Sequence, residues 1–168
     1  MQGTDEFGFN YVHCDGFTMC GGQRPPYTVL SHPNVGDRVE NQFVFPYEGT
    51  ATIYADGVAP LLLNTGFLND VSNFAGKAMS VHFSSEGGRW ISLNPNPASK
   101  RFNAVLLKDG QETTITATDK QCIVFSLQGV ALCNAVEIPE MQYATITEGR
   151  VVTVKAQPNA IVAIFTER

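Results

Sequence analysis

The residues with the richest chemistry in this sequence are a few histidines and cysteines, most of them near its start. His13, Cys14, Cys20 and His32 follow the spacing His-Cys-x5-Cys-x11-His. A structural zinc site uses a pair of cysteines separated by about two to four residues, and this spacing contains no such pair. A nucleophile, Cys14 or Cys20 activated by His32 or His82, needs a base within hydrogen-bond reach and a third orienting group. The spacing shows neither a base within reach nor an orienting group. We therefore predict that these histidines and cysteines are ordinary structural residues.

Acidic and aromatic side chains give no stronger pattern. Any two of the 16 acidic residues can in principle form the carboxylate pair of a glycoside hydrolase, but no local pattern selects a pair. Glu137 and Glu140 flank Pro139 and are expected to be solvated turn residues. Trp90 and Tyr47 are candidates for an aromatic platform that binds sugars, although a lone tryptophan on a strand more often packs in a core or an interface. We therefore assign no catalytic, cofactor-binding or metal-binding residue, and we expect no cofactor.

Composition restricts the class of protein and of partner. The 168 residues are 43% hydrophobic and only 16% charged, which suits a folded chain of one domain or two small ones. The net charge of −5 and the lack of any basic cluster larger than Lys100–Arg101 argue against nucleic acid as a partner. Residues 1–7 lack a secretory signal pattern, and apolar segments such as 161–165 are far too short to span a bilayer. We expect synthesis in the cytoplasm and no membrane partner.

Short β-strand signals recur along the whole chain, and long helical periodicity is absent. Glycine turns at 47–49, 56–57 and 86–88 separate the strands of the first part, and residues 68–75 fit a short helical turn. The strands predicted there are 41–45, 50–55, 58–63, 77–84 and 89–93. In segment 77–84 the polar residues Ser80, His82 and Ser84 alternate with apolar ones, which predicts a half-buried strand.

Strand signals are densest after residue 100. The spacing predicts eight short strands, at 102–107, 112–117, 122–127, 130–133, 136–138, 143–146, 150–154 and 160–165. Eight strands of this length favour a jelly roll or small barrel, which leaves few free edges. The fold class is therefore all-β.

The chain divides at a segment rich in proline and asparagine, residues 94–100, whose prolines cannot join a ladder. Residues 1–25 mix glycines with aromatic residues and cannot easily make their own core. We therefore predict an extended N-terminal arm at 1–25, a β-rich region at 26–95 and a jelly-roll barrel at 100–168.

The stretch 122–138 is an apolar strand ending in Gly129, followed by a short return strand. It is similar to the central hairpin of a cupin, and the resemblance covers about residues 100–167. The continuation 143–154, with Gly149, and the strand 160–165 extend the resemblance. It implies a cupin-like barrel and says little about activity.

The resemblance also implies where metal ligands would lie. Aligning the glycine of the first cupin motif to Gly129 places Cys122 at the acidic ligand. The histidine pair then falls at Ile115 and Ala117, or at Thr116 and Thr118. Aligning the second motif to Gly149 places Ala160 at the late histidine and Lys155 at the motif's proline. A first-row metal needs three or four N, O or S donors, so the sequence predicts a barrel without the cupin metal site.

Two cysteines of this part, Cys122 and Cys133, are predicted to lie on neighbouring strands of one hairpin that turns at Gln128 and Gly129. Cys133 then faces Val124, and the two thiols are diagonal neighbours, which is a long distance for a disulfide. We expect both to be reduced and to fill space in the core.

Two functions remain open. Low charge, a glycine-rich and aromatic arm, and a barrel without metal ligands favour a non-catalytic structural or assembly protein that acts through contacts with its own or other protein subunits. The first expectation is a virion component, such as a phage capsid decoration, cement or tail-associated protein. The alternative is a metal-independent cupin-like enzyme or binding protein for a sugar or small organic acid. Side chains on the barrel axis discriminate: Ile115, Val124, Ala160 and Val162 would fill it, whereas inward polar groups would indicate a ligand.

Overall fold

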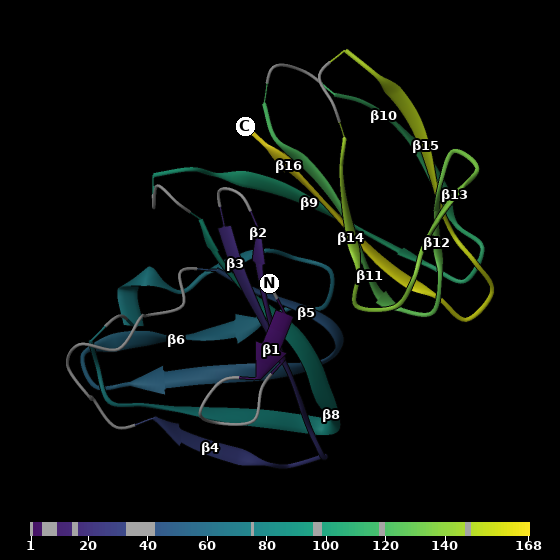
Figure 1. Cartoon of the computed structure of the whole chain (residues 1–168). Coiled ribbons are helices and arrows are strands. Elements are labelled where there is room, and N and C mark those ends of the chain that lie inside the picture. The colour runs from purple at the N-terminus through teal and green to yellow at the C-terminus, as the bar shows by residue number, and fades with distance from the viewer. Residues whose placement is uncertain are drawn as a thin grey trace. The chain divides into compact units, whose positions relative to one another are not determined.

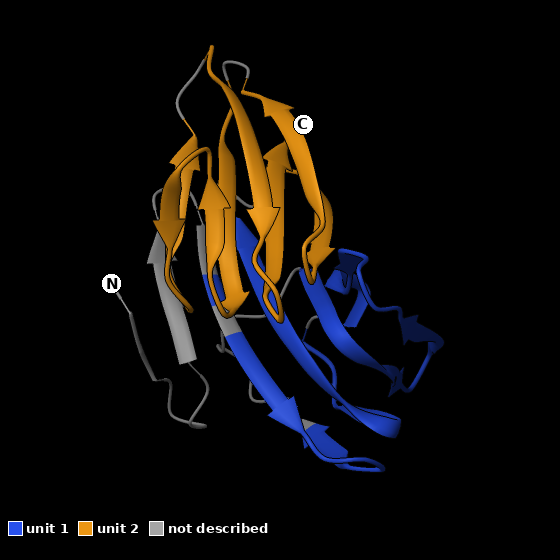
Figure 2. Ribbon diagram, turned by 90° about the vertical axis from the view of Figure 1, so that its right-hand side faces the viewer, with its two compact units in different colours: residues 1–100 blue, residues 101–168 orange. Residues whose placement is uncertain are grey.

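The computed structural model describes residues 2–4, 10–14, 17–32, 43–74, 76–95, 99–117, 120–146 and 149–168, with the backbone alone for 2–4, 10–14, 17–18, 20 and 32. These residues form sixteen β-strands and one short 3-10 helix, η1 (Ser72–Phe74). Figure 1 shows the strands of both parts of the chain, most of them labelled. The chain divides into two compact units, Met1–Lys100 and Arg101–Arg168, coloured separately in Figure 2. No helix in the described ranges has the length and apolarity needed to cross a bilayer. The predicted all-β class is confirmed.

Unit 1, residues 1–100, is built on one antiparallel sheet. Its strands are β1 (Gln2–Thr4), β2 (Asn10–Cys14), β3 (Phe17–Arg24), β4 (Val29–His32), β5 (Phe43–Ala55), β6 (Val58–Leu63), β7 (Asn69–Asp70) and β8 (Met79–Pro95). The order is β1-β2-β3-β8-β5-β6, while β4 also pairs with β8 and β7 with β5. The segment predicted as an arm thus supplies three strands, and β3 pairs with β8. That this segment also packs on another subunit stays a prediction.

Two turns predicted in this unit are wrong. The glycine turns at 47–49 and 86–88 lie inside the long strands β5 and β8 and do not end them. The two glycine segments face each other across the ladder, where Gly49 pairs with Gly88. The pairing shifts register on both sides of this point, which marks β-bulges. The glycines therefore bend two paired strands together, and the local sequence resembles two turns for that reason.

The bend requires glycine because the backbones nearly touch. Gly49 has a φ of +69°, and a Cβ added to it would lie 2.1 Å from the carbonyl oxygen of Gly87. Gly87 itself has a φ of +70°, and its Cβ would lie 2.6 Å from the carbonyl oxygen of Arg24 in β3. Side chains other than hydrogen are excluded at both positions by conformation and by space. Three strands are thus held together at one point by glycine.

One face of the unit 1 sheet is apolar and buried. Because side chains alternate along a strand, every second residue of β5, β6 and β8 lies on this face. The buried cluster consists of Val44, Ala51, Ile53, Leu63, Val71, Phe74 and Phe83, with Leu30, Leu61, Met79 and Val81 packed against it. In β4, β6, residues 51–55 of β5 and residues 79–83 of β8, the residues between them therefore lie on the opposite face.

Unit 2, residues 101–168, is a sandwich of two four-stranded antiparallel sheets. Its strands are β9 (Phe102–Lys108), β10 (Glu112–Thr116), β11 (Cys122–Gln128), β12 (Ala131–Cys133), β13 (Val136–Ile138), β14 (Tyr143–Ile146), β15 (Val151–Ala156) and β16 (Ile161–Glu167). The sheets have the orders β10-β15-β12-β13 and β14-β11-β16-β9. This is the strand order of a jelly roll, and the eight predicted strands are confirmed.

The predicted hairpin between β11 and β12 is wrong. The chain does turn at Gly129, which has a φ of +65°, but the two strands then part into different sheets. Strand β11 pairs with β14 and β16, whereas β12 pairs with β13 and β15. In a jelly roll most consecutive strands cross between the sheets, so a tight glycine turn does not imply hydrogen-bonded neighbours.

The interior of the sandwich is filled by apolar side chains. Val124, Ala160 and Val162 are at most 1% exposed, and Ile115 packs against them, as predicted for a filled barrel. The opposite faces of β11 and β16 are buried as well, since Phe125 and Phe165 are at most 1% exposed. Burial on both faces explains why these strands have continuous apolar sequences.

The bend in β5 gives a first prediction. Gly57 is a matched control for Gly49, because it also has a positive φ, +77°, but no atom within 4 Å of an added Cβ. Gly57→Ala should lower the free energy of unfolding by about 1 kcal/mol, from backbone strain alone. Gly49→Ala should lower it by at least about 2 kcal/mol more than Gly57→Ala does, because the Gly87 backbone must move. Urea unfolding of both variants measures the difference, and equal costs would show that the close approach does not matter.

The filled interior gives a second prediction. Val162, which is fully buried, and Val151, which is 61% exposed, are both strand valines of unit 2. Val162→Ala should lower the free energy of unfolding by about 2 kcal/mol, because it leaves a cavity. Val151→Ala should change it by about 0.5 kcal/mol or less. A small loss for Val162→Ala in chemical denaturation would mean that the sandwich interior is loosely packed.

Candidate functional site

Beyond the bend, on β4, β6, residues 51–55 of β5 and residues 79–83 of β8, the outer side of the unit 1 sheet carries several hydrogen-bonding side chains. They alternate with the buried cluster along β4, β8, β5 and β6. We call this surface the His82 face, and it consists of Val29, Ser31, Thr52, Tyr54, Leu62, Ser80 and His82. The cross-strand register fixes their positions relative to one another.

Contacts at the centre of the His82 face are between side chains. Ser80 Oγ lies 3.1 Å from His82 Nε2. The rings of Tyr54 and His82 meet edge to face with centroids 4.9 Å apart. Tyr54 is 43% exposed and His82 is exposed too, so these groups are open to solvent. The result is an ordered surface of hydroxyl, imidazole and phenol groups.

The Ser80–His82 pair has the separation of a nucleophile and its base. Catalysis by such a pair also needs a group that orients the imidazole and donors that stabilise an oxyanion. In the described part of the chain, no carboxylate is hydrogen-bonded to His82. The pair lies on the exposed face of a strand, so its polar groups are accessible to a ligand.

The bend between β5 and β8 holds a second polar group. Arg89 donates two hydrogen bonds to the carboxylate of Glu48, of 2.7 Å from Nε and 2.6 Å from Nη2. The same guanidinium lies 5.0 Å from the centre of the Tyr47 ring. The two charged residues sit beside the bulge that joins their strands. The ion pair therefore stabilises the bend, and its bidentate geometry occupies the carboxylate.

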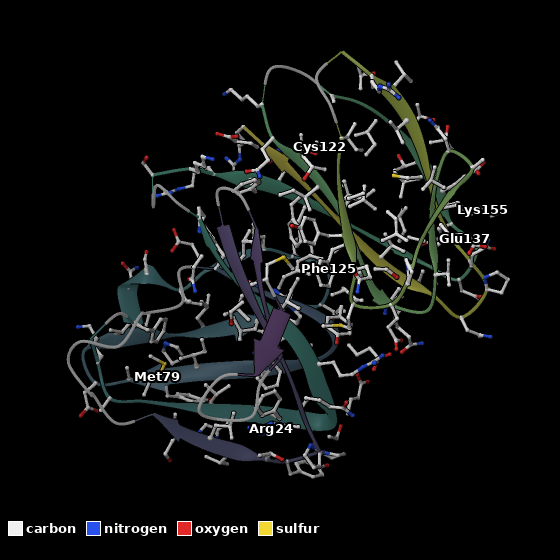
Figure 3. The ribbon with its side chains drawn as sticks, in the orientation of Figure 1. Arg24, Met79, Cys122, Phe125, Glu137 and Lys155 are labelled. Carbon is white, nitrogen blue, oxygen red and sulfur yellow. The ribbon has the colours of Figure 1, made fainter. Side chains whose placement is uncertain are left out.

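Trp90 and Tyr47 do not form an exposed aromatic platform. Tyr47 is 8% exposed and lies under Arg89. Trp90 packs against the buried cluster, 5.2 Å from the ring of Phe83. Arg24, labelled in Figure 3, covers it with its guanidinium 5.9 Å from the ring centre. Both rings serve the packing of unit 1.

In unit 2, the positions implied for metal ligands are part of the apolar interior. Ala117, Cys122 and Ala160 are at most 3% exposed and belong to one buried cluster, against which Ile115 packs. Thr116 is exposed, and Thr118 lies outside the described residues. Across the described ranges, no three residues of the types His, Cys, Asp or Glu come together as a metal site would require.

The cysteines Cys122 and Cys133 lie in that same interior but on different sheets, as free thiols. Burial raises the pKa of the Cys122 thiol, although a contact with Thr166 Oγ1 at 3.8 Å opposes this in part. Burial also raises the pKa of Cys133, and the neighbouring Cys122 adds to the effect. Neutral thiols are poor nucleophiles and poor metal ligands, so both fill space as predicted.

The side chains of His13, Cys14, Cys20 and His32 lie outside the described residues, but their strands are placed. Cys20 pairs with Ser92 of β8, whereas His32 pairs with Met79 at the other end of that strand. His82 pairs with Val29, so it too is far from Cys20 along β8. A strand rises roughly 3.3 Å per residue. The register therefore does not bring His32 or His82 to Cys20.

Glu137 and Glu140 have separate places in unit 2. Glu140 Oε1 accepts a hydrogen bond of 3.0 Å from the backbone N–H of Gly129, so it fixes a turn. Glu137 is exposed on β13, opposite Leu132, and Lys155 on β15 lies opposite the same leucine. Figure 3 shows Glu137 and Lys155 on the outer side of their sheet. Glu140 is thus an exposed turn residue, as predicted, whereas the exposed Glu137 belongs to a strand.

Comparison with known proteins places the fold. No family model matches the sequence, and no curated protein matches it either. AerE from Microcystis aeruginosa aligns with 100% of this chain and 97% of its own, at 12% identity and a TM-score of 0.62. The fold is cupin-like.

Other solved structures agree with that assignment. Quercetin 2,3-dioxygenase from Acinetobacter baumannii aligns with 100% of this chain and 83% of its own, at 12% identity and a TM-score of 0.59. HutD from Pseudomonas fluorescens aligns with 100% of this chain and 94% of its own, at 12% identity and a TM-score of 0.54. The likeness to cupin-like proteins thus extends through both units, beyond the C-terminal part that the sequence indicated. At these identities it concerns the fold alone.

The sequence predicted part of the His82 face and missed the rest. Alternation in segment 77–84 already placed Ser80 and His82 on one side of a strand. Tyr54 and Thr52 come from a strand 26 or more positions earlier, and only the β5–β8 register brings them to His82. No spacing signal in one sequence reports that register.

The buried thiols give a third prediction. A raised pKa means that the folded protein keeps thiol protons which the unfolded chain releases, so stability falls as the pH rises above the ordinary thiol value. Between about pH 8 and pH 10 the wild type should lose more stability than the variant Cys122→Ala/Cys133→Ala. Denaturant unfolding across this range measures the two slopes. The cavity made by the substitutions lowers the free energy of unfolding by an amount that does not depend on pH. If the free energy of unfolding changes with pH equally in both proteins, the thiol pKa values are not raised.

Proposed function

We propose that this protein is a metal-independent cupin-like binding protein, whose ligand is a sugar or a small organic acid. One observation supports this most directly. The positions that would hold metal ligands in a cupin carry Ala117, Cys122 and Ala160, and these residues pack in the apolar interior of unit 2. Proteins with this kind of fold include enzymes and binding proteins. The described residues of this interior, however, supply too few donors for a first-row metal.

The donor set is the reason for excluding a cupin-type metal centre in unit 2. Alanine and isoleucine offer no lone pair, and Cys122 supplies one thiol whose pKa is raised. A first-row metal takes three or four ligands that converge on one point. Binding through hydrogen bonds and ring contacts remains, and the exposed hydroxyl, imidazole and phenol groups of the His82 face in unit 1 are suited to it.

The virion role expected from composition has no support among the compared structures, none of which is described as a virion component. The low charge and the N-terminal strands that suggested it are equally compatible with a binding protein. We therefore favour the second function. Self-association and contacts with other proteins stay predictions that a mass measurement in solution can test.

The fourth prediction tests metal-independent binding. Protein purified without chelators should contain much less than one first-row metal per chain by mass spectrometry. Titration calorimetry against neutral sugars and small carboxylic acids should detect a ligand, and EDTA should change its Kd by less than about twofold. A stoichiometric metal whose removal abolishes binding would overturn the proposal, and so would the lack of any ligand in both classes.

A further inference from the structure

We propose that the His82 face is the ligand site and that its ligand is a neutral saccharide. This inference rests on the proposed function and adds the place and the chemical class. The sugar's apolar C–H side would lie against the Tyr54 ring, and its hydroxyl groups would hydrogen-bond with Ser80, His82 and Thr52. The order of residues across the sheet, their chemistry and their exposure support this.

Cross-strand register places the residues of the face in two rows. The first row crosses four strands through Val29, His82, Thr52 and Leu62. The second row contains Ser31, Ser80 and Tyr54. Adjacent strands are about 4.8 Å apart, so neighbouring hydroxyl groups have the spacing needed to contact one sugar ring together.

The chemistry of the face matches a neutral, hydroxyl-rich ligand. Serine, threonine and tyrosine hydroxyls each donate and accept hydrogen bonds, as every sugar hydroxyl does. The seven residues of the His82 face include no Asp, Glu, Lys or Arg. By contrast, the outer row of unit 2 through Leu132 contains Glu112, Lys155 and Glu137. The face carries no lysine or arginine, the usual partners of a carboxylate, so a saccharide fits better than an organic acid.

The pattern of exposure favours a small ligand over a second copy of the chain. A protein interface has an apolar centre and a polar rim. Here the order is reversed, because Val29 and Leu62, 54% and 51% exposed, are at the two ends of the first row. His82 and Thr52 occupy its centre, beside the exposed Tyr54 ring. A polar centre with one aromatic ring and apolar ends suits a sugar ring.

The fifth prediction tests the site with the full chain. A microarray of neutral oligosaccharides identifies the best binder, which is then titrated by calorimetry. Tyr54→Ala should weaken its binding by about tenfold or more, and Ser80→Ala by several-fold. Tyr54→Phe should bind more tightly than Tyr54→Ala, because it retains the ring. Tyr143→Ala is the matched control, since Tyr143 is a strand tyrosine of unit 2 with 36% exposure, and it should bind as the wild type does.

The outcomes separate this inference from the proposed function. If Tyr54→Ala and Ser80→Ala bind the saccharide as the wild type does, the His82 face is not the ligand site. Binding of carboxylic acids alone would overturn the ligand class, while metal-independent binding would stand. Lack of binding in both classes would overturn both. Thermal unfolding of each variant confirms that lost binding is not lost folding.

A mass measurement tests the competing occupant. Thr52→Lys puts a charge at the centre of the face, where two copies related by a two-fold axis would bring like charges together. Sedimentation should give the same mass for this variant and for the wild type. If Thr52→Lys converts a dimer to a monomer, the face is a subunit contact and the saccharide site is wrong.

Discussion

The close approach of backbone between β5 and β8 is the constraint on which unit 1 depends. Gly49, Gly87 and Gly88 let the two longest strands and β3 meet at a point where no side chain fits. The bidentate pair of Arg89 and Glu48 joins the strands beside that point. Because both strands bend together, they stay paired on both sides of the bend. The ordered outer face exists because that pairing continues to Ala55 and Met79.

The described interior of the unit 2 sandwich is packed almost entirely with apolar side chains. Alanine, valine and isoleucine fill the space between the sheets, and the two thiols are neutral parts of the same packing. An unpaired polar group in such an interior costs free energy unless it finds a partner. The hydrogen bonds of Ser126 and Glu140 to the backbone of Gly129 instead stabilise a turn at the end of the sandwich. Its tightly filled interior and hydrogen-bonded turn make unit 2 a rigid scaffold.

The two units differ in how far sequence reasoning reached. In unit 2 the eight strands agree with the prediction to within about two residues, because each is short and most are followed within three residues by a glycine, asparagine or proline. In unit 1 the same glycine signal was misread, since Gly49 and Gly87 bend strands that continue. Local sequence does not distinguish a turn from a bulge, because both need positive φ. Whether such a glycine makes a turn or a bulge depends on how the partner strand pairs with it.

The sequence by itself predicted the all-β class and the cupin-like character of about residues 100–167. These depend on residue type and on the period of two along a strand, which are local properties. Only the tertiary structure decided that β11 and β12 belong to different sheets and that Tyr54 meets His82. Both facts depend on which strands pair with each other. Strands pair through backbone hydrogen bonds, and these do not depend on residue type. Register is fixed when whole apolar faces are buried together, so it becomes visible only in the folded chain.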